Sequence, residues 1–77
     1  MNFAKTLVSI MQSKSVTSYS LSKATGISDS LIGYYRTEKN SPSAENLIKI
    51  ADYFNISIDY LVGRTDAPEI NRTGAES

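Results

Sequence analysis

The feature that most constrains the fold is a short turn at residues 25–28, Thr-Gly-Ile-Ser, between two segments with helical spacing. Gly26 can end a helix in the left-handed conformation without a Cβ clash, and Ser28 is a favoured N-cap for the next helix. A turn of this length that contains glycine sets two helices at roughly 90–120° to each other. The sequence therefore predicts two short helices, at 18–25 and 29–37, that cross at a steep angle.

Hydrophobic residues at helical spacing predict three further helices. The clearest repeat, i, i+3, i+4 and i+7, lies at 44–54, and similar spacing predicts helices at 2–13 and 58–62. No segment alternates as a strand does, so we expect an all-α, compact five-helix domain at 1–63 and a polar tail or linker start at 64–77. The expected N-caps are Asn2, Thr17, Ser28, Ser43 and Ser57.

A single core is expected from the apolar face of each helix. In the angled pair, Ile27 and Tyr35 should point inward, and the close helix contact needs a small residue, Ser22 or Ala24. Ala24 is expected to face inward beside Leu21. The residues predicted to be buried together are Leu7, Leu21, Ile32, Leu47, Ile50 and Phe54.

The composition argues against several classes of function. The 77 residues contain no cysteine and no histidine, which removes thiolate metal sites and the commonest general base and metal ligand. There is also no glycine-rich phosphate loop and no paired carboxylates, so we expect no enzyme activity, no metal and no cofactor. No apolar run approaches the roughly 18 residues of a membrane helix, and the lack of cysteine suits a cytoplasmic protein.

The charges are divided unevenly along the chain, although the formal net charge is zero. Residues 1–41 hold five basic and two acidic side chains, a net +3, whereas residues 42–77 hold three basic and six acidic ones, a net −3. A neutral total can therefore hide a mildly basic face suited to nucleic acid.

A set of apolar and turn residues recurs along the chain at the spacings of a known family: Leu21, Gly26-Ile27-Ser28, Ile32, Tyr35, Pro42-Ser43, Leu47, Ile50-Ala51 and the closing run from Phe54 to Gly63, Phe-Asn-Ile-Ser-Ile-Asp-Tyr-Leu-Val-Gly. Through these positions, residues 3–63 resemble the lambda-repressor-like, or XRE-like, helix-turn-helix family. The resemblance implies a dimeric repressor or activator of bacterial or phage type that binds duplex operator DNA, with the helix at 29–37 in the major groove and the helix before it crossing the backbone.

Five positions depart from the family's common pattern. Ser18 stands where glutamine is usual, and Asp29 replaces a frequent arginine or glutamine. Arg36 stands where glutamate is common, Glu38 where glycine is common, and Thr25 where leucine is usual. The changes at Ser18 and Asp29 bear on which bases the protein would contact.

The predicted base-contacting residues are Ser18, Asp29, Ser30, Gly33 and Tyr34. Asp29 can accept from cytosine N4, but an aspartate in a first helical turn also interacts favourably with the helix dipole. Gly33 costs roughly 1 kcal/mol inside a helix, which suggests close approach to DNA or to the preceding helix, with drift as the alternative. Tyr34 lies just outside the apolar stripe and either contacts DNA or covers the surface.

The predicted phosphate contacts are Thr17, Ser20, Ser28, Lys39, Asn40 and Ser41. The hydroxyl residues have N-capping as their alternative role, and residues 39–41 have a solvated loop. Arg36 is expected to pair with Glu38 or another carboxylate, or to contact DNA.

Residues 53–62 contain more apolar side chains than one short helix needs for its own packing. The surplus predicts a homodimer interface, with Tyr60 and Val62 as its exposed pair. The leading functional hypothesis is a sequence-specific transcriptional repressor that blocks polymerase by occupying an operator. The alternative is a protein-interaction module, such as an antitoxin or adaptor, that keeps the fold with weak or no DNA binding.

Overall fold

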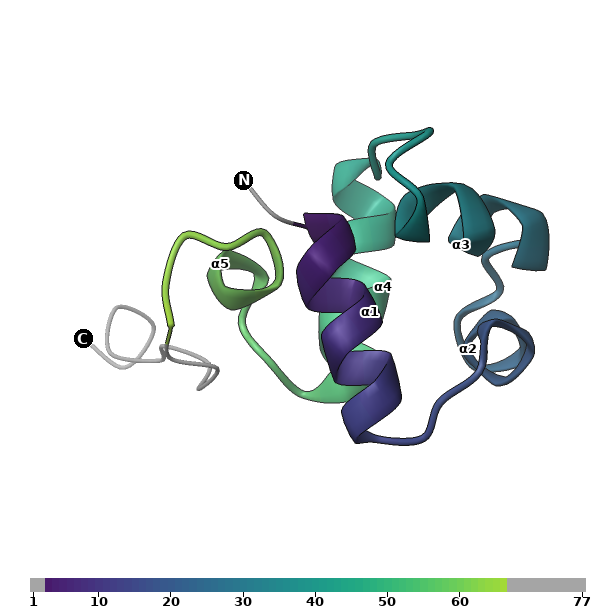
Figure 1. Ribbon diagram of the computed structural model, residues 1–77, viewed down its shortest axis with the longest axis horizontal. Coiled ribbons are helices and arrows are strands. Elements are labelled where there is room, and N and C mark those ends of the chain that lie inside the picture. The colour runs from purple at the N-terminus through teal and green to yellow at the C-terminus, as the bar shows by residue number, and fades with distance from the viewer. Residues whose placement is uncertain (1–2, 67–77) are drawn as a thin grey trace.

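The computed structural model describes residues 3–66, which form five helices and no strand, so the all-α prediction is confirmed. Figure 1 shows α2 and α3 at one end of the molecule and α5 at the other, with α1 and α4 between them. The helices are α1 (Phe3–Ser13), α2 (Ser18–Thr25), α3 (Asp29–Arg36), α4 (Ala44–Phe54) and α5 (Ile58–Leu61). The predicted cap Asn2 and the tail residues 67–77 lie outside the described residues.

The hydroxyl N-caps set the starts of four helices, as the sequence predicts. The side-chain oxygens of Thr17, Ser28, Ser43 and Ser57 each accept a backbone N–H three residues ahead. Gly26, at φ 79°, ends α2 in the left-handed conformation. α3 and α5 end one residue earlier than predicted, because Thr37 and Val62 already have C-cap geometry rather than helical geometry.

The core lies between all five helices. Its fully buried side chains come from α1, α2, α3, α4 and α5, one from each: Leu7, Leu21, Ile32, Ile50 and Leu61. Phe54 is also buried as predicted, but Leu47 is only partly buried and packs on the edge of the cluster. Leu47 lines a surface hollow between the start of α1 and the loop before α4, so one side of it remains open.

The expectation that Ala24 faces inward is wrong, because Ala24 is exposed. With 3.6 residues per turn, the residues that share the buried side of Leu21 are Ser18, Ser22 and Thr25, and all three are partly buried. Ser22 is therefore the small residue on the inner face of α2. None of the helices within residues 3–66 combines the length and the apolar character needed to cross a membrane.

Candidate nucleic-acid interface

α3 turns one stripe of side chains toward solvent and the opposite stripe into the core. Ile32 and Tyr35 are buried, and Leu31 is partly buried beside them. On the other side, Asp29 and Ser30 are exposed and Tyr34 is 47% exposed. The helical repeat places the predicted contact residues in one outward stripe, which consists of Asp29, Ser30, Gly33 and Tyr34.

Gly33 is not required by packing within the protein. A Cβ placed on Gly33 would meet no atom within 4 Å, apart from its own helix's backbone and chain neighbours. Close approach to α2, one of the three explanations that the sequence leaves open, is therefore wrong. The two explanations that remain are close approach of DNA to the backbone of α3 and drift, and the free space beside Gly33 is compatible with both.

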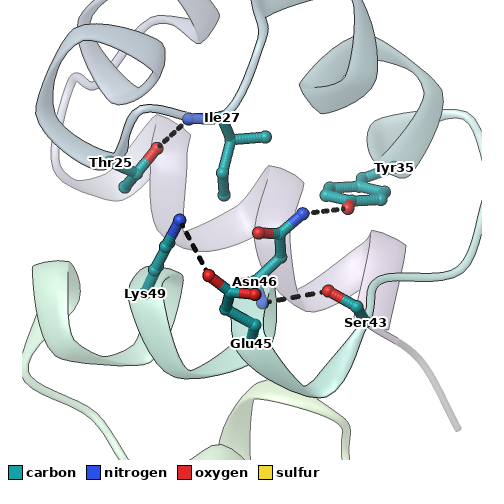
Figure 2. A network of polar contacts seen from close by, with 7 residues as sticks. All are labelled: Thr25, Ile27, Tyr35, Ser43, Glu45, Asn46 and Lys49. Carbon is teal, nitrogen blue, oxygen red and sulfur yellow. Dashed lines mark hydrogen bonds and ion pairs between the residues drawn. The ribbon is translucent and has the colours of Figure 1, made fainter.

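Tyr35 holds α3 against the helices behind it. Its hydroxyl accepts a hydrogen bond of 2.8 Å from Asn46 Nδ2 of α4, as Figure 2 shows. Its ring meets that of Phe3 of α1 edge-on, with centroids 5.6 Å apart. The backbone N–H of Asn46 in turn donates to the cap Ser43, so the contact to α3 comes from a capped first turn. The contacts of Tyr35 with α4 and α1 therefore fix the orientation of α3 and of its outward stripe.

The turn between α2 and α3 is stabilised by Thr25, where the family usually has leucine. Its hydroxyl donates to the carbonyl of Leu21 at 2.8 Å and accepts the backbone N–H of Ile27 at 3.2 Å, the second of which is drawn in Figure 2. Ile27 is buried, so the turn is anchored by its apolar side chain and by this hydroxyl bridge. The departure at Thr25 therefore supports the predicted helix-turn-helix geometry.

Three of the predicted phosphate-contacting hydroxyls, those of Thr17, Ser20 and Ser28, act as caps in the structure. Thr17 and Ser20 form a reciprocal capping box at the start of α2, with Thr17 N to Ser20 Oγ and Ser20 N to Thr17 Oγ1 both at 3.0 Å. Their hydroxyl hydrogens are also engaged, in Thr17 Oγ1 to Ser20 Oγ and Ser20 Oγ to Thr17 O. Ser28 caps α3 by accepting from Leu31 N. Its own O–H donates in no hydrogen bond within residues 3–66, so among the three it is the best placed to donate outward.

The loop after α3 is fixed by its backbone and leaves its polar side chains in solvent. The N–H groups of Lys39 and Asn40 both approach the carbonyl of Tyr34, at 2.8 and 3.4 Å. The side chains of Lys39, Asn40 and Ser41 are exposed, next to the outward stripe in sequence. Glu38 takes φ 64°, which explains why glycine is common at this position in the family.

A hydrogen bond between the side chains of Arg36 and Ser18 joins α3 to α2. Arg36 Nη1 donates to Ser18 Oγ at 2.8 Å, linking the last residue of α3 to the first residue of α2. The expectation that Arg36 pairs with Glu38 or another carboxylate is therefore wrong for the described residues. The oxygen of Ser18, a residue predicted to contact bases, accepts this hydrogen bond from a neighbouring cation.

Within residues 3–66, ion pairs form only after residue 42, in the part of the sequence where acidic residues are in excess. The two ion pairs within residues 3–66 are Lys49–Glu45 at 3.4 Å and Arg64–Asp59 at 3.9 Å, and all four partners lie after residue 42. The five cations of the first 41 residues form no ion pair in that range. Lys23 instead lies 5.6 Å from the ring centroid of Tyr19. The positive charge of this half is therefore not neutralised by contacts within the described part.

The most exposed apolar side chains near α5 are not the two that the sequence predicts. Tyr60 and Val62, predicted as the exposed pair, are only partly exposed: Tyr60 packs on the core and Val62 lines the hollow beside Leu47. Tyr53 and Ile58 are more open, at 42% and 40%. The sequence pattern misses this because α5 has only one turn before its cap, so its inward and outward residues are not resolved by periodicity.

These features define a helix-turn-helix unit, in which one helix is held at a steep angle on another and turns a polar stripe away from the core. The chain belongs to the helix-turn-helix family, whose sequence profile matches residues 9–61. The resemblance to the lambda-repressor-like branch and the five-helix fold are thereby confirmed.

Two similar proteins place the chain further. It is 28% identical over 67 residues to a Bacillus subtilis (strain 168) protein named uncharacterized HTH-type transcriptional regulator YobD. That match covers 87% of this chain and 60% of the Bacillus protein, so the chain spans less than two thirds of its relative. The crystal structure of a transcriptional regulator from Listeria innocua has the same fold, with a TM-score of 0.77 and 24% identity over 97% of this chain and 70% of the other.

Proposed function

We propose that this protein is a sequence-specific regulator of transcription that binds duplex DNA with α3 in the major groove. The observation that carries the proposal is the outward stripe of α3. The first turn of this helix is exposed and a Cβ at Gly33 would have free space around it, while Ile32 and Tyr35 on the opposite side are buried. An α-helix fits the major groove of B-DNA, and the first turns of such a helix reach the base edges. Membership of the helix-turn-helix family and the regulator names of both similar proteins support the proposal.

The proposed mode of action is steric repression by a dimer in the bacterial cytoplasm. A dimer bound to an operator would exclude polymerase from the overlapping promoter. Tyr53 and Ile58 join Tyr60 and Val62 as candidates for the dimer contact, because the first two are the more exposed apolar side chains near α5. Two half-sites one helical turn apart would then bring both α3 helices into successive major grooves.

A protein-interaction role without DNA is the competing function. It is favoured by the zero formal net charge and by Asp29, whose carboxylate is exposed where phosphates would pass. The two functions differ in salt dependence, because neutralising phosphates releases counterions and makes affinity fall steeply with salt. Selection of bound duplexes from a random pool, followed by titration at several salt concentrations, separates them. Recovery of no enriched sequence and no salt-dependent binding would favour the interaction module.

Asp29 and Lys39 provide the test within the site. If Asp29 accepts from a cytosine, Asp29→Ala should relax preference at one base pair by about 1–3 kcal/mol. If it is only a helix-end charge, the same change should strengthen binding to every duplex. Lys39→Ala should instead weaken binding to all duplexes and reduce the salt slope by about one. Titrations of both variants on the selected site and its single-base variants measure these effects.

A further inference from the structure

The Arg36–Ser18 hydrogen bond joins α2 and α3 at the ends that are remote from the turn between them. α2 and α3 are joined by the turn at 25–28, and this contact joins their opposite ends, from the last residue of α3 to the first of α2. The guanidinium is therefore held at the junction of the two helices rather than extended into solvent on a free stem.

The partner of Arg36 leaves its charge uncompensated. A serine hydroxyl is neutral, and Arg36 forms no ion pair among residues 3–66. The residue is exposed, and a guanidinium carries five N–H donors in a planar fork, of which Ser18 takes one. That fork matches the oxygens of a phosphate, with which arginine forms paired hydrogen bonds.

Ser18 adds a second donor at the same place. Its oxygen accepts from Arg36, so its own O–H can point outward, and Ser18 remains partly exposed. Thr17 and Ser20, its neighbours in the first turn, use their hydroxyl hydrogens on each other and on the backbone. Arg36 and Ser18 therefore supply an adjacent cationic donor and hydroxyl donor, whereas the capping box does not.

We propose that Arg36 binds a phosphate of the DNA backbone, with Ser18 as the residue that positions it and as a second donor. The proposal rests on the proposed function, in which α3 enters the major groove and α2 crosses the backbone. The junction of those two helices then lies at the groove edge, beside a phosphate. Because glutamate is common at this position in the family, the contact would be a property of this chain.

The experiment compares four variants on the selected duplex and on an unrelated duplex, over a range of salt concentrations. Arg36→Ala should weaken both complexes by roughly tenfold, the loss of one charged hydrogen bond, and reduce the salt slope by about 0.9. Arg36→Lys should keep the slope and part of the affinity. Ser18→Ala should keep the slope and weaken binding less than Arg36→Ala does. Arg64→Ala is the matched control, because it removes the same charge from the acidic half, and its slope should not change.

If Arg36 only links α3 to α2 and does not contact DNA, a different set of results is expected. In that case Arg36→Ala and Arg36→Lys would both lower the melting temperature, with an unchanged salt slope for the folded fraction. An unchanged slope and affinity for Arg36→Ala, while the parent protein binds DNA with the usual salt dependence, overturns this proposal alone. Failure of the parent protein to bind any duplex overturns the proposed function and this contact with it.

Discussion

The hydroxyl of Tyr35 accepts a hydrogen bond of 2.8 Å from Asn46 Nδ2, which joins the outward-facing α3 to the first turn of α4. The tyrosine is 2% exposed, so its hydroxyl depends on this partner rather than on bulk water. The orientation of the outward stripe is therefore set by a polar contact as well as by apolar packing.

Tyr35→Phe tests that contact while keeping the ring against Phe3. We expect the free energy of unfolding to fall by about 0.5–1.5 kcal/mol, since one hydrogen bond is lost and Asn46 is only partly buried. Tyr34→Phe is the matched control on the same helix, because the Tyr34 ring is 47% exposed and has no side-chain hydrogen bond within residues 3–66. Urea denaturation of the two variants measures the difference. Equal stabilities would show that the Asn46 contact contributes nothing to the position of α3.

Gly33→Ala is expected to change stability and DNA affinity in opposite directions. Alanine should stabilise α3 by about 1 kcal/mol, because glycine is a poor helix former and the added Cβ meets no other atom within 4 Å. The same methyl would lie between α3 and the DNA, where overpacking should weaken the complex by about 1–3 kcal/mol. Thermal unfolding and duplex titration of one preparation measure both. A stabilised variant that binds as tightly as the parent would place Gly33 away from the DNA.

Glu38→Gly should stabilise the protein by relieving the left-handed backbone at φ 64°. The relief is about 1–2 kcal/mol and the entropy of glycine in the unfolded chain offsets about 0.4–1 kcal/mol, so we expect a net gain of about 0.5–1 kcal/mol. Glu38→Ala keeps the backbone cost and removes only the charge. If denaturation shows the same change for both, the effect comes from the carboxylate and not from the backbone.

Ile50→Ala should lower the free energy of unfolding by about 2–5 kcal/mol, because Ile50 is fully buried at the centre of the core. So small a domain has little stability in reserve, and much of it would unfold. Ile48→Ala, two residues earlier on the same helix, removes the same atoms from a side chain that is 48% exposed and should cost less than about 0.5 kcal/mol. A loss below half a kcal/mol at Ile50 would contradict the assigned face of α4.

The sequence by itself determined the helices, their starts and most of the core. Caps such as Ser28 and Ser43 act on backbone groups only three residues away, and the repeat of Ile50 and Phe54 follows from 3.6 residues per turn. Both are local relations, which a linear sequence displays. The outward stripe of α3 could be predicted for the same reason, since burying Ile32 and Tyr35 leaves the opposite side of one helix open.

Only the tertiary structure decided which long-range partners those residues meet. Arg36 takes Ser18 rather than a carboxylate, and Tyr35 takes Asn46, because the crossing of whole helices brings these atoms together. Likewise, Ala24 is exposed and Leu47 is partly buried. The sides of α2 and α4 that are covered depend on the direction from which the other helices pack against them, and that direction is a property of the assembled fold. Periodicity gives the angle of a residue around its own helix, but the position of the neighbouring helices sets what that angle faces.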